Sequence, residues 1–386
     1  MALKYLYVPS GYIAGTAYGV LPNVAAADFS FTRDSAGFRV NSDGLLESEL
    51  SDVPRLDYTD SSCPSLLLEA SKTNLVTYSE NFTDSDWGKT NSTVTANATI
   101  DPQGGNDGFL VSLDTSEAYV NHAVSFLAEP TTFSVYLKSP TVAGTYPLNW
   151  YASNGGNHHR ELVNVTTEWK RFEINFTPTG LGGRFIYIGD IRGDGAAATL
   201  SSVYAWGAQV ESSSKATSYI KTEADVITRS ADTGIVTSDL SSYINSTEGV
   251  LEVKMSRFEG ISSAEQSWIS LSASETNDDN SVSVGFTNSN ATLAHFIKSS
   301  DANVTTPTTS QVTEDLSQMN VIKLKWKDGD FKAKIGNTTI DLSAGAGSLP
   351  FASTLKYLRI GYPNYSAGAF KGNIQYIKVY DSATDF

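Results

Sequence analysis

The chain has 386 residues, enough for two or three domains that each bury a hydrophobic core. Its 27 basic and 42 acidic residues leave a formal net charge of −15. This balance argues against nucleic acid or an anionic membrane surface as the main partner, because both require clustered lysine and arginine. Only 18% of the residues are charged, and the abundance of Val, Ile, Thr and aromatic residues between Gly and Asn is typical of β-structure.

The few cysteine and histidine residues exclude several kinds of site. Cys63 is the only cysteine, which rules out an internal disulfide framework and a zinc site held by cysteines. Four histidines leave little for histidine-based metal or triad chemistry. No apolar run approaches the ~18 residues of a membrane-spanning helix, and the first residues lack the apolar stretch of a secretory signal. We therefore expect that the protein is made in a cytosol and does not insert into a membrane.

Residues 1–79 show scattered apolar pairs and turns with little sustained periodicity. The apolar stretches 5–8 and 66–68 have no pattern that would bury them against each other. Apolar surface left in water costs roughly 25 cal/mol per Å², so this segment should pack on another surface. The sequence predicts an extended N-terminal arm, and the alternative is an independently folded domain.

Residues 80–225 are predicted to form an antiparallel β-sandwich. Phe133, Val135 and Leu137 alternate with more polar residues, and the same alternation recurs in 171–176 and 204–210. A period of two places successive side chains on opposite faces of a strand, so each of these strands is expected to be half-buried. Several such strands, separated by Gly, Asn and Pro turns, favour a sandwich.

Residues 226–386 are predicted to form a second sandwich. Ile322, Leu324 and Trp326 alternate with three lysines, and Asp328 and Gly329 then provide residues that tolerate the positive φ of a tight hairpin. The predicted fold class is therefore all-β, with two antiparallel β-sandwich (jelly-roll) domains, 80–225 and 226–386, behind the extended N-terminal arm 1–79.

A set of short motifs links the predicted arm to the first sandwich. They are VPRLDY at 53–58, LLLE at 66–69, TNL at 73–75, YSENF at 78–82, YAWGAQVE at 204–211 and TSYIKT at 217–222. The set resembles the tail, fibre and structural proteins of tailed-phage virions. Residues 80–225 resemble carbohydrate-binding-module-like jelly rolls, and the C-terminal part is similar to concanavalin A-like or laminin-G-like lectin sandwiches.

The resemblance implies a non-enzymatic bacteriophage virion protein, a tail or head fibre or a decoration component. It implies synthesis in the host bacterial cytoplasm and location in the virion, with residues 1–79 serving virion attachment and oligomerisation. The expected partners are other virion proteins, sister subunits in a homotrimer, and a polysaccharide of the bacterial surface, without nucleic acid. The trimer is expected by analogy with phage fibres alone.

The alternative function is a glycan depolymerase, the enzyme of a tailspike. Retaining glycosidases need two carboxylates about 5 Å apart on one strand face. Glu47, Glu49 and Asp52 come nearest to such a set, but their order differs from the known pattern, and Glu223 and Asp225 lack a third partner. Neither a Gly-x-Ser-x-Gly elbow nor a phosphate-binding loop is present. We therefore predict no catalytic residues.

One stretch combines aromatic and planar polar side chains. Sugars present apolar C–H faces that stack on exposed aromatic rings, and hydroxyls that bind amide or guanidinium groups. The sequence predicts a carbohydrate site at Trp150, Tyr151, Asn157, His158 and Arg160. In the alternative, Trp150 belongs to the core and the polar residues form a solvated loop.

The stretch NDDN at 277–280 is a candidate calcium site. Asp278 and Asp279 place several hard oxygen ligands on one loop, as Ca²⁺ prefers. The alternative is an acidic turn without metal. No other cofactor is predicted.

Overall fold

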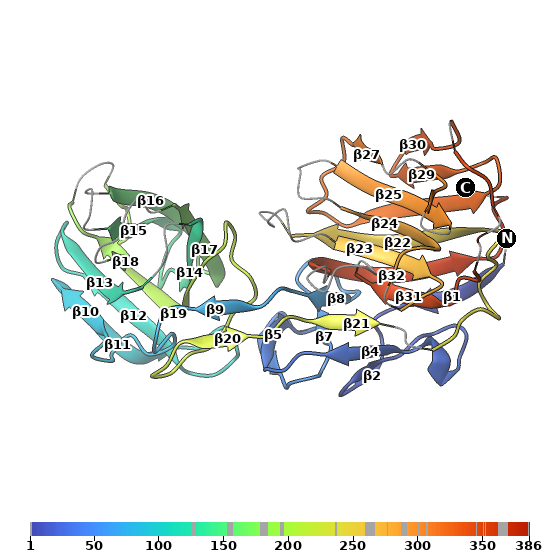
Figure 1. Cartoon of the computed structure of the whole chain (residues 1–386). Coiled ribbons are helices and arrows are strands. Elements are labelled where there is room, and N and C mark those ends of the chain that lie inside the picture. Colours follow the sequence, from blue (N-terminus) through green and yellow to red (C-terminus); the bar gives the residue numbers. More distant parts are fainter. Residues whose placement is uncertain are drawn as a thin grey trace. The chain divides into compact units, whose positions relative to one another are not determined.

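The computed structural model is built almost entirely of β-strands (Figure 1). It describes residues 2–125, 129–152, 157–177, 184–193, 197–235, 238–258, 267–275, 277–286, 292–299, 302–305, 308–344, 346–349, 351, 353–361, 370–384 and 386. Within these ranges the one helical element is the 3-10 turn η1, Ala25–Ala27, and no helix could span a membrane. The all-β prediction is confirmed.

The chain divides into two compact units. Unit 1 contains Met1–Gly44, Ser48–Ser71 and Ser230–Phe386, and unit 2 contains Leu45–Glu47 and Lys72–Arg229. Unit 2 is therefore inserted into the sequence of unit 1.

Unit 1 contains two antiparallel sheets that share one core. In the part of the chain that is described, eight strands form the first sheet, with β1 (Leu3–Tyr7) paired to β32. The order of the other strands is β30 (Thr338–Asp341), β29 (Lys332–Ile335), β28 (Asn320–Lys327), β22 (Glu248–Arg257), β32 (Gly372–Tyr380), β8 (Ser65–Leu68) and β7 (Arg55–Asp57).

The second sheet of unit 1 has ten strands among the residues described, with β27 (Thr308–Gln311) paired to β25. The order of the others is β2 (Tyr12–Ile13), β3 (Thr16–Ala17), β4 (Phe29–Thr32), β21 (Thr233–Ile235), β31 (Tyr357–Ile360), β23 (Ser267–Ser272), β24 (Ser281–Phe286), β25 (Thr292–Ser299) and β26 (Ala302–Asn303). A separate pair is formed by β5 (Gly37–Val40) and β6 (Leu46–Glu49).

Alternation along the strands builds the core of unit 1. Val253, Ile322 and Ile335 lie in one cross-strand row of β22, β28 and β29, and all three side chains are fully buried. Their neighbours Glu252 and Lys323 pair on the other face, where an ion pair of 3.1 Å joins them. The hairpin between β28 and β29 turns at Gly329 with φ of +70°.

The N-terminal segment differs from the predicted extended arm, because most of residues 1–71 belong to unit 1. Strands β1 and β8 both pair with β32, the last strand of the chain. The rings of Tyr5 and Tyr7 are fully buried and pack edge-on against Phe29. The strand β1 is therefore held by the backbone of the C-terminal strand β32, while its two rings pack on Phe29 of the N-terminal segment, all within one core.

Four buried charged residues hold this segment to the start of the C-terminal part. Arg55 donates to Glu69 Oε2 at 2.7 Å and to Asp232, and Arg33 Nη1 donates to Asp232 Oδ1 at 3.1 Å. The backbone N–H of Glu69 donates to Asp232 Oδ2 at 2.8 Å. We call Arg33, Arg55, Glu69 and Asp232 the buried ion network. Its charges balance two against two, as burial requires.

Unit 2 is a sandwich of two sheets. Among the strands described, one sheet has the order β10 (Trp87–Thr90), β13 (Ala118–Ala123), β18 (Arg184–Asp190), β15 (Gly144–Ala152) and β16 (Asn157–Val165). The other has the order β11 (Ser92–Thr99), β12 (Gly108–Leu113), β19 (Ser202–Glu211), β14 (Thr131–Lys138) and β17 (Lys170–Phe176). A short ribbon is formed by β9 (Lys72–Asn74) and β20 (Ile227–Arg229).

The connections of unit 2 follow the jelly-roll pattern. From β10 to β19, only β11 and β12, and β15 and β16, join neighbours in one sheet. Every other connection in this series crosses from one sheet to the other. This crossing brings strands together that are distant in sequence, and it sets which side chains share a face.

Several motif residues cross-link unit 2 from inside. The side-chain amide of Asn74 donates to the carbonyl of Ile220 at 2.8 Å, and Gln209 Oε1 accepts from the N–H of Ile220 at 2.8 Å. The Thr217 hydroxyl donates to Glu211 Oε2 at 2.8 Å. The sequence motifs around these residues therefore encode buried hydrogen bonds of the fold.

Candidate functional site

Four adjacent strands of unit 2, β13, β18, β15 and β16, present a tyrosine-rich face. Leu148, Ile186 and Ile188 of these strands point into the core, so the residues between them lie on the opposite face. We call this surface the tyrosine face; its residues are Tyr119, Asn121, Asn149, Tyr151, His158, Arg160, Phe185 and Tyr187.

The strand register sorts these side chains into two rows. One row runs Asn121, Tyr187, Asn149 and Arg160 across the four strands. The other contains Phe185, Tyr151 and His158. Cross-strand neighbours on one face have Cβ atoms about 5 Å apart. The aromatic rings, Asn121, His158 and Arg160 therefore lie side by side on this face, while Asn149 between them is fully buried.

The aromatic rings contact one another. Tyr119 and Tyr187 are 5.1 Å apart between ring centroids and meet edge to face, and Phe185 lies 6.2 Å from Tyr187. Tyr119, Tyr151 and Phe185 are half-buried. Burial, followed by the proximity of Tyr119 and Tyr151, raises the pKa of Tyr187 to about 12. Tyr187 thus stays a neutral phenol with an O–H donor at every physiological pH.

Hydrogen bonds fix the polar side chains of this face. The amide nitrogen of Asn149 donates to the carbonyl of Gly189, so its oxygen Oδ1 is the acceptor for His158 Nε2 at 2.8 Å. His158 therefore carries a hydrogen on Nε2. Arg160 Nε donates to Asp190 Oδ2 at 2.7 Å. Polar groups held in this way can bind a ligand without first losing much conformational entropy.

The structure separates the residues predicted as a carbohydrate site. Tyr151, His158 and Arg160 lie on the tyrosine face, but Trp150 does not. Its ring is 7% exposed and stacks on Phe176 with centroids 4.3 Å apart and planes at 17°. Trp150 is part of the core, because neighbouring residues of a strand face opposite sides. The backbone of Asn157 begins β16, and its side chain lies outside the described residues.

Sequence reasoning missed half of the tyrosine face. Tyr119 and Asn121 flank the buried Val120, and Phe185 and Tyr187 flank the buried Ile186. This alternation of buried and more exposed residues along each strand was a visible signal for the direction of each side chain. The pairing of β18 with both β13 and β15, which brings these residues together, had no local signal.

The candidate calcium residues have a different arrangement from a metal site. The Asp278 side chain is fully buried and forms an ion pair with Lys298 Nζ at 2.7 Å. Asp279 is half-buried, and its N–H points at Asn277 Oδ1 at 3.4 Å. Across the ranges described, no three His, Cys, Asp or Glu side chains gather as metal ligands. An ammonium group thus neutralises the carboxylate on which the calcium prediction depended.

Three of the five carboxylates considered for catalysis, Glu49, Asp52 and Glu223, have structural partners. Glu49 Oε1 accepts from Arg39 Nε at 2.6 Å, and Asp52 Oδ1 accepts from the N–H of Arg33 at 2.9 Å. Glu223 lies 3.5 Å from Lys221 Nζ. These contacts explain the carboxylates as ion pairs and hydrogen-bond acceptors of the fold.

No family model matches the sequence, and no curated protein matches it. Among solved structures, the chain is similar to the CBM22-1 xylan-binding domain of Xyn10C from Paenibacillus barcinonensis, with a TM-score of 0.30 and 15% identity over 39% of this chain and 99% of that one. The tandem CBM22-1–CBM22-2 domain of the same protein has a TM-score of 0.29 and 11% identity, over 81% of this chain and 99% of that one. The enzymatically active domain of bacteriophage CBA120 tailspike protein 4 has a TM-score of 0.26 and 16% identity, over 36% of this chain and 21% of that one. At these TM-scores the likenesses assign neither a family nor a ligand to this chain.

Proposed function

We propose that this protein is a non-enzymatic bacteriophage virion protein, a fibre or decoration component, that binds a glycan of the host surface through the tyrosine face of unit 2. The observation that carries the proposal is a group of four aromatic rings, three of them half-buried and that of Tyr187 buried, beside the Asn121 amide and the fixed imidazole and guanidinium groups on four adjacent strands. Aromatic rings stack on the C–H faces of sugars, and planar polar groups bind their hydroxyls.

The composition of the face favours a glycan over an apolar ligand. Arg160 and His158 are held by Asp190 and Asn149 in fixed directions beside the rings. An apolar ligand would cover these polar groups without replacing their bonds to water, which costs free energy. A polyhydroxylated ligand offers both the apolar C–H surface and the hydrogen-bond partners.

The virion part of the proposal rests on the motifs between residues 53 and 222. It includes location in the particle, contacts with other virion proteins and a homotrimer, as symmetric fibres commonly form. Light scattering of the full-length chain tests the trimer, with an expected mass of three chains. A monomer over a wide concentration range would contradict it.

A glycan array with the full-length chain tests the binding site. On any glycan that binds, Tyr151→Ala is expected to weaken binding at least about tenfold, because an aromatic anchor is the largest single term of such sites. Tyr204→Ala is the matched control, since Tyr204 is a half-buried tyrosine on β19 of the other sheet. Equal losses in both variants, or no loss in Tyr151→Ala, would remove the tyrosine face as the site.

A reducing-end assay tests the non-enzymatic part. The bound glycan, incubated with the full-length chain, is expected to release no new reducing ends. Continuous release would favour the depolymerase alternative over simple adhesion, whichever face holds the sugar.

A further inference from the structure

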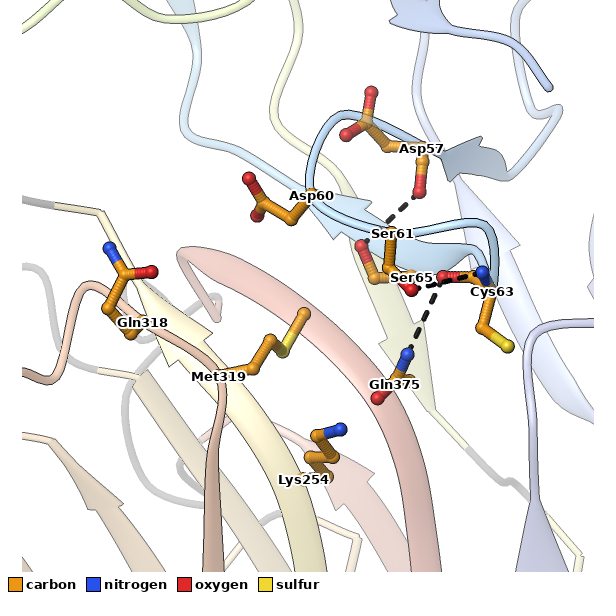
Figure 2. A pocket seen from close by; sticks show the side chains of 9 residues that line it. All are labelled: Asp57, Asp60, Ser61, Cys63, Ser65, Lys254, Gln318, Met319 and Gln375. Carbon is orange, nitrogen blue, oxygen red and sulfur yellow. Dashed lines mark hydrogen bonds between the residues drawn. The ribbon is translucent and has the colours of Figure 1, made fainter. Parts of the chain in front are cut away.

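Unit 1 contains a cavity of about 330 Å³ (Figure 2). It lies where the loop between β7 and β8 meets β22, the turn before β28, and β32. The lining is mostly polar and consists of Asp57, Asp60, Ser61, Cys63, Ser65, Lys254, Gln318, Met319 and Gln375. A space of this size is at the lower end of small-molecule sites.

An irregularity in β32 shapes one side of the cavity. On one edge, β8 pairs with residues 372–374 of β32 and β1 pairs with 377–380. On the other edge, the register with β22 shifts between Lys254 and Met255, so that Gln375 has no partner in that ladder. Such a bulge redirects a side chain. The Gln375 amide reaches the cavity and its nitrogen lies 3.5 Å from the carbonyl of Cys63.

Two opposite charges line the cavity without meeting. Among the residues that the structure describes, neither the Asp60 carboxylate nor the Lys254 ammonium has an ion pair or a hydrogen bond. Figure 2 shows them on opposite sides of the cavity, with Met319 and Ser61 between them in this view. The neighbouring Asp57 differs, because its carboxylate accepts the N–H groups of Val40 and Thr59.

Several other lysines on this sheet form ion pairs with acids. Lys323 and Lys378 both bind Glu252, at 3.1 and 3.3 Å, and Glu252 stands two residues before Lys254 on β22. Among the described residues Lys254 has no such acid, which it shares with Lys334 of β29. Unlike Lys334, it lines the cavity.

We propose that this cavity binds a small zwitterion, with the ammonium group of the ligand at Asp60 and an anionic oxygen group at Lys254. A ligand with both charges neutralises two groups that form no ion pair with each other. A simple cation would leave Lys254 without a partner, and a simple anion would meet the repulsion of Asp57 and Asp60. The side chains of Gln318 and Ser61 provide further hydrogen-bonding groups at the wall.

The environment of Asp60 agrees with an ammonium partner. Asp60 is an exposed residue, and its partial desolvation in the cavity, followed by the nearby Asp57, raises its pKa. An ammonium group beside the carboxylate would favour the ionised form again. Binding is therefore expected to weaken as the pH falls through the pKa of Asp60.

Calorimetry with the full-length chain tests the site. The probes are phosphoethanolamine, a headgroup of bacterial surface lipids, and the free amino acids glycine, β-alanine and 4-aminobutyrate. Ethylamine and acetate, which each carry one of the charges, are expected to bind at least tenfold more weakly than the best zwitterion. Preference for phosphoethanolamine would identify a lipid or lipopolysaccharide group as the source, and preference for an amino acid would identify a free metabolite.

Substitutions separate this site from general effects of charge. Lys254→Gln and Asp60→Asn are each expected to weaken binding at least tenfold, whereas Lys254→Arg retains most of it. Lys334→Gln is the control, because Lys334 is a half-buried lysine of the same sheet outside the cavity. Tyr151→Ala should leave this binding unchanged, which keeps the test independent of the glycan proposal.

Two results would overturn the proposal. One is the absence of binding by every zwitterion at millimolar concentration. The other is binding that Lys254→Gln and Asp60→Asn both retain at the level of the unchanged chain.

Discussion

Removal of the Asp232 carboxylate should destabilise unit 1 strongly. The side chain has no exposed surface, and it accepts hydrogen bonds from Arg33, Arg55 and the N–H of Glu69. In Asp232→Ala, two buried guanidinium groups face only one carboxylate, that of Glu69. Breaking a buried ion pair from one side costs about 3–5 kcal/mol. Since folded domains are stable by only about 5–15 kcal/mol, this loss is a large fraction of the total.

Urea unfolding with hydrogen exchange measures the loss and locates it. With an m-value of about 2–3 kcal/mol per molar urea, the midpoint of unit 1 should fall by about 1–2 M. Amides of β4, β8 and β21 should exchange faster, while those of β14 and β17 in unit 2 should keep their protection. Asp43→Ala is the control, because Asp43 is exposed. A change below about 1 kcal/mol in Asp232→Ala would refute the idea that the network holds the N-terminal segment in place.

Three further outcomes are expected. Trp150→Ala should lower the stability of unit 2 by about 3–5 kcal/mol in calorimetric unfolding, and Tyr151→Ala by about 1 kcal/mol or less; equal effects would contradict their opposite faces. Burial lowers the pKa of His295 to about 4, below its unfolded value near 6.5. The free energy of unfolding should therefore fall by about 3 kcal/mol as the pH drops from 7 to 4. In urea unfolding at several pH values, His295→Gln should lack this part of the pH dependence. Deletion of residues 2–9 removes the buried Tyr5 and Tyr7 and should unfold unit 1 but not unit 2, as measured by the loss of amide protection in hydrogen exchange. Retained protection in unit 1 would instead support the prediction of an extended arm.

Much of the local structure could be predicted because it depends on neighbouring residues. The alternation of Ile322, Leu324 and Trp326 with lysines reports directly on one buried face, and the positive φ of Gly329 follows from the turn that must come next. Both signals lie within a few residues of the structure that they predict. The all-β class rests on many such local signals.

The long-range partners could not be predicted from a single sequence. Arg55 and Asp232 are 177 residues apart, yet they share a buried ion pair. The apolar residues of β1 show no local pattern, because their partners are on β32. A hint was available in the motifs, where charged residues stand inside apolar stretches. Buried charges need partners. Arg55 and Glu69, which stand in such stretches, form an ion pair with each other.

The candidate site was predictable only in part for the same reason. Tyr151, His158 and Arg160 lie on the two strands of one hairpin, so their proximity is local. Tyr119 and Tyr187 reach the same face through sheet pairing between strands far apart in the sequence. The inclusion of Trp150 beside Tyr151 was an avoidable error, since a strand cannot direct both side chains to one face.

The pairing of the first strand with the last one governs how the protein can fold during synthesis. The N–H of Ala2 bonds to the Asp381 side chain across 379 positions of sequence. At about 5–20 residues per second, β1 therefore waits roughly 20–75 s on the ribosome before its partner β32 is made.

Unit 2 has no such delay, because all of Lys72–Arg229 is made before β32. Throughout the wait, β1 with Tyr5 and Tyr7 lacks its sheet partner β32, although Phe29 has already been made. Apolar groups exposed in this way are bound by chaperones. A chain that stops before residue 372 keeps them exposed permanently. Burial of β1 thus marks a chain that has been translated through β32, and products that stop earlier remain open to proteolysis.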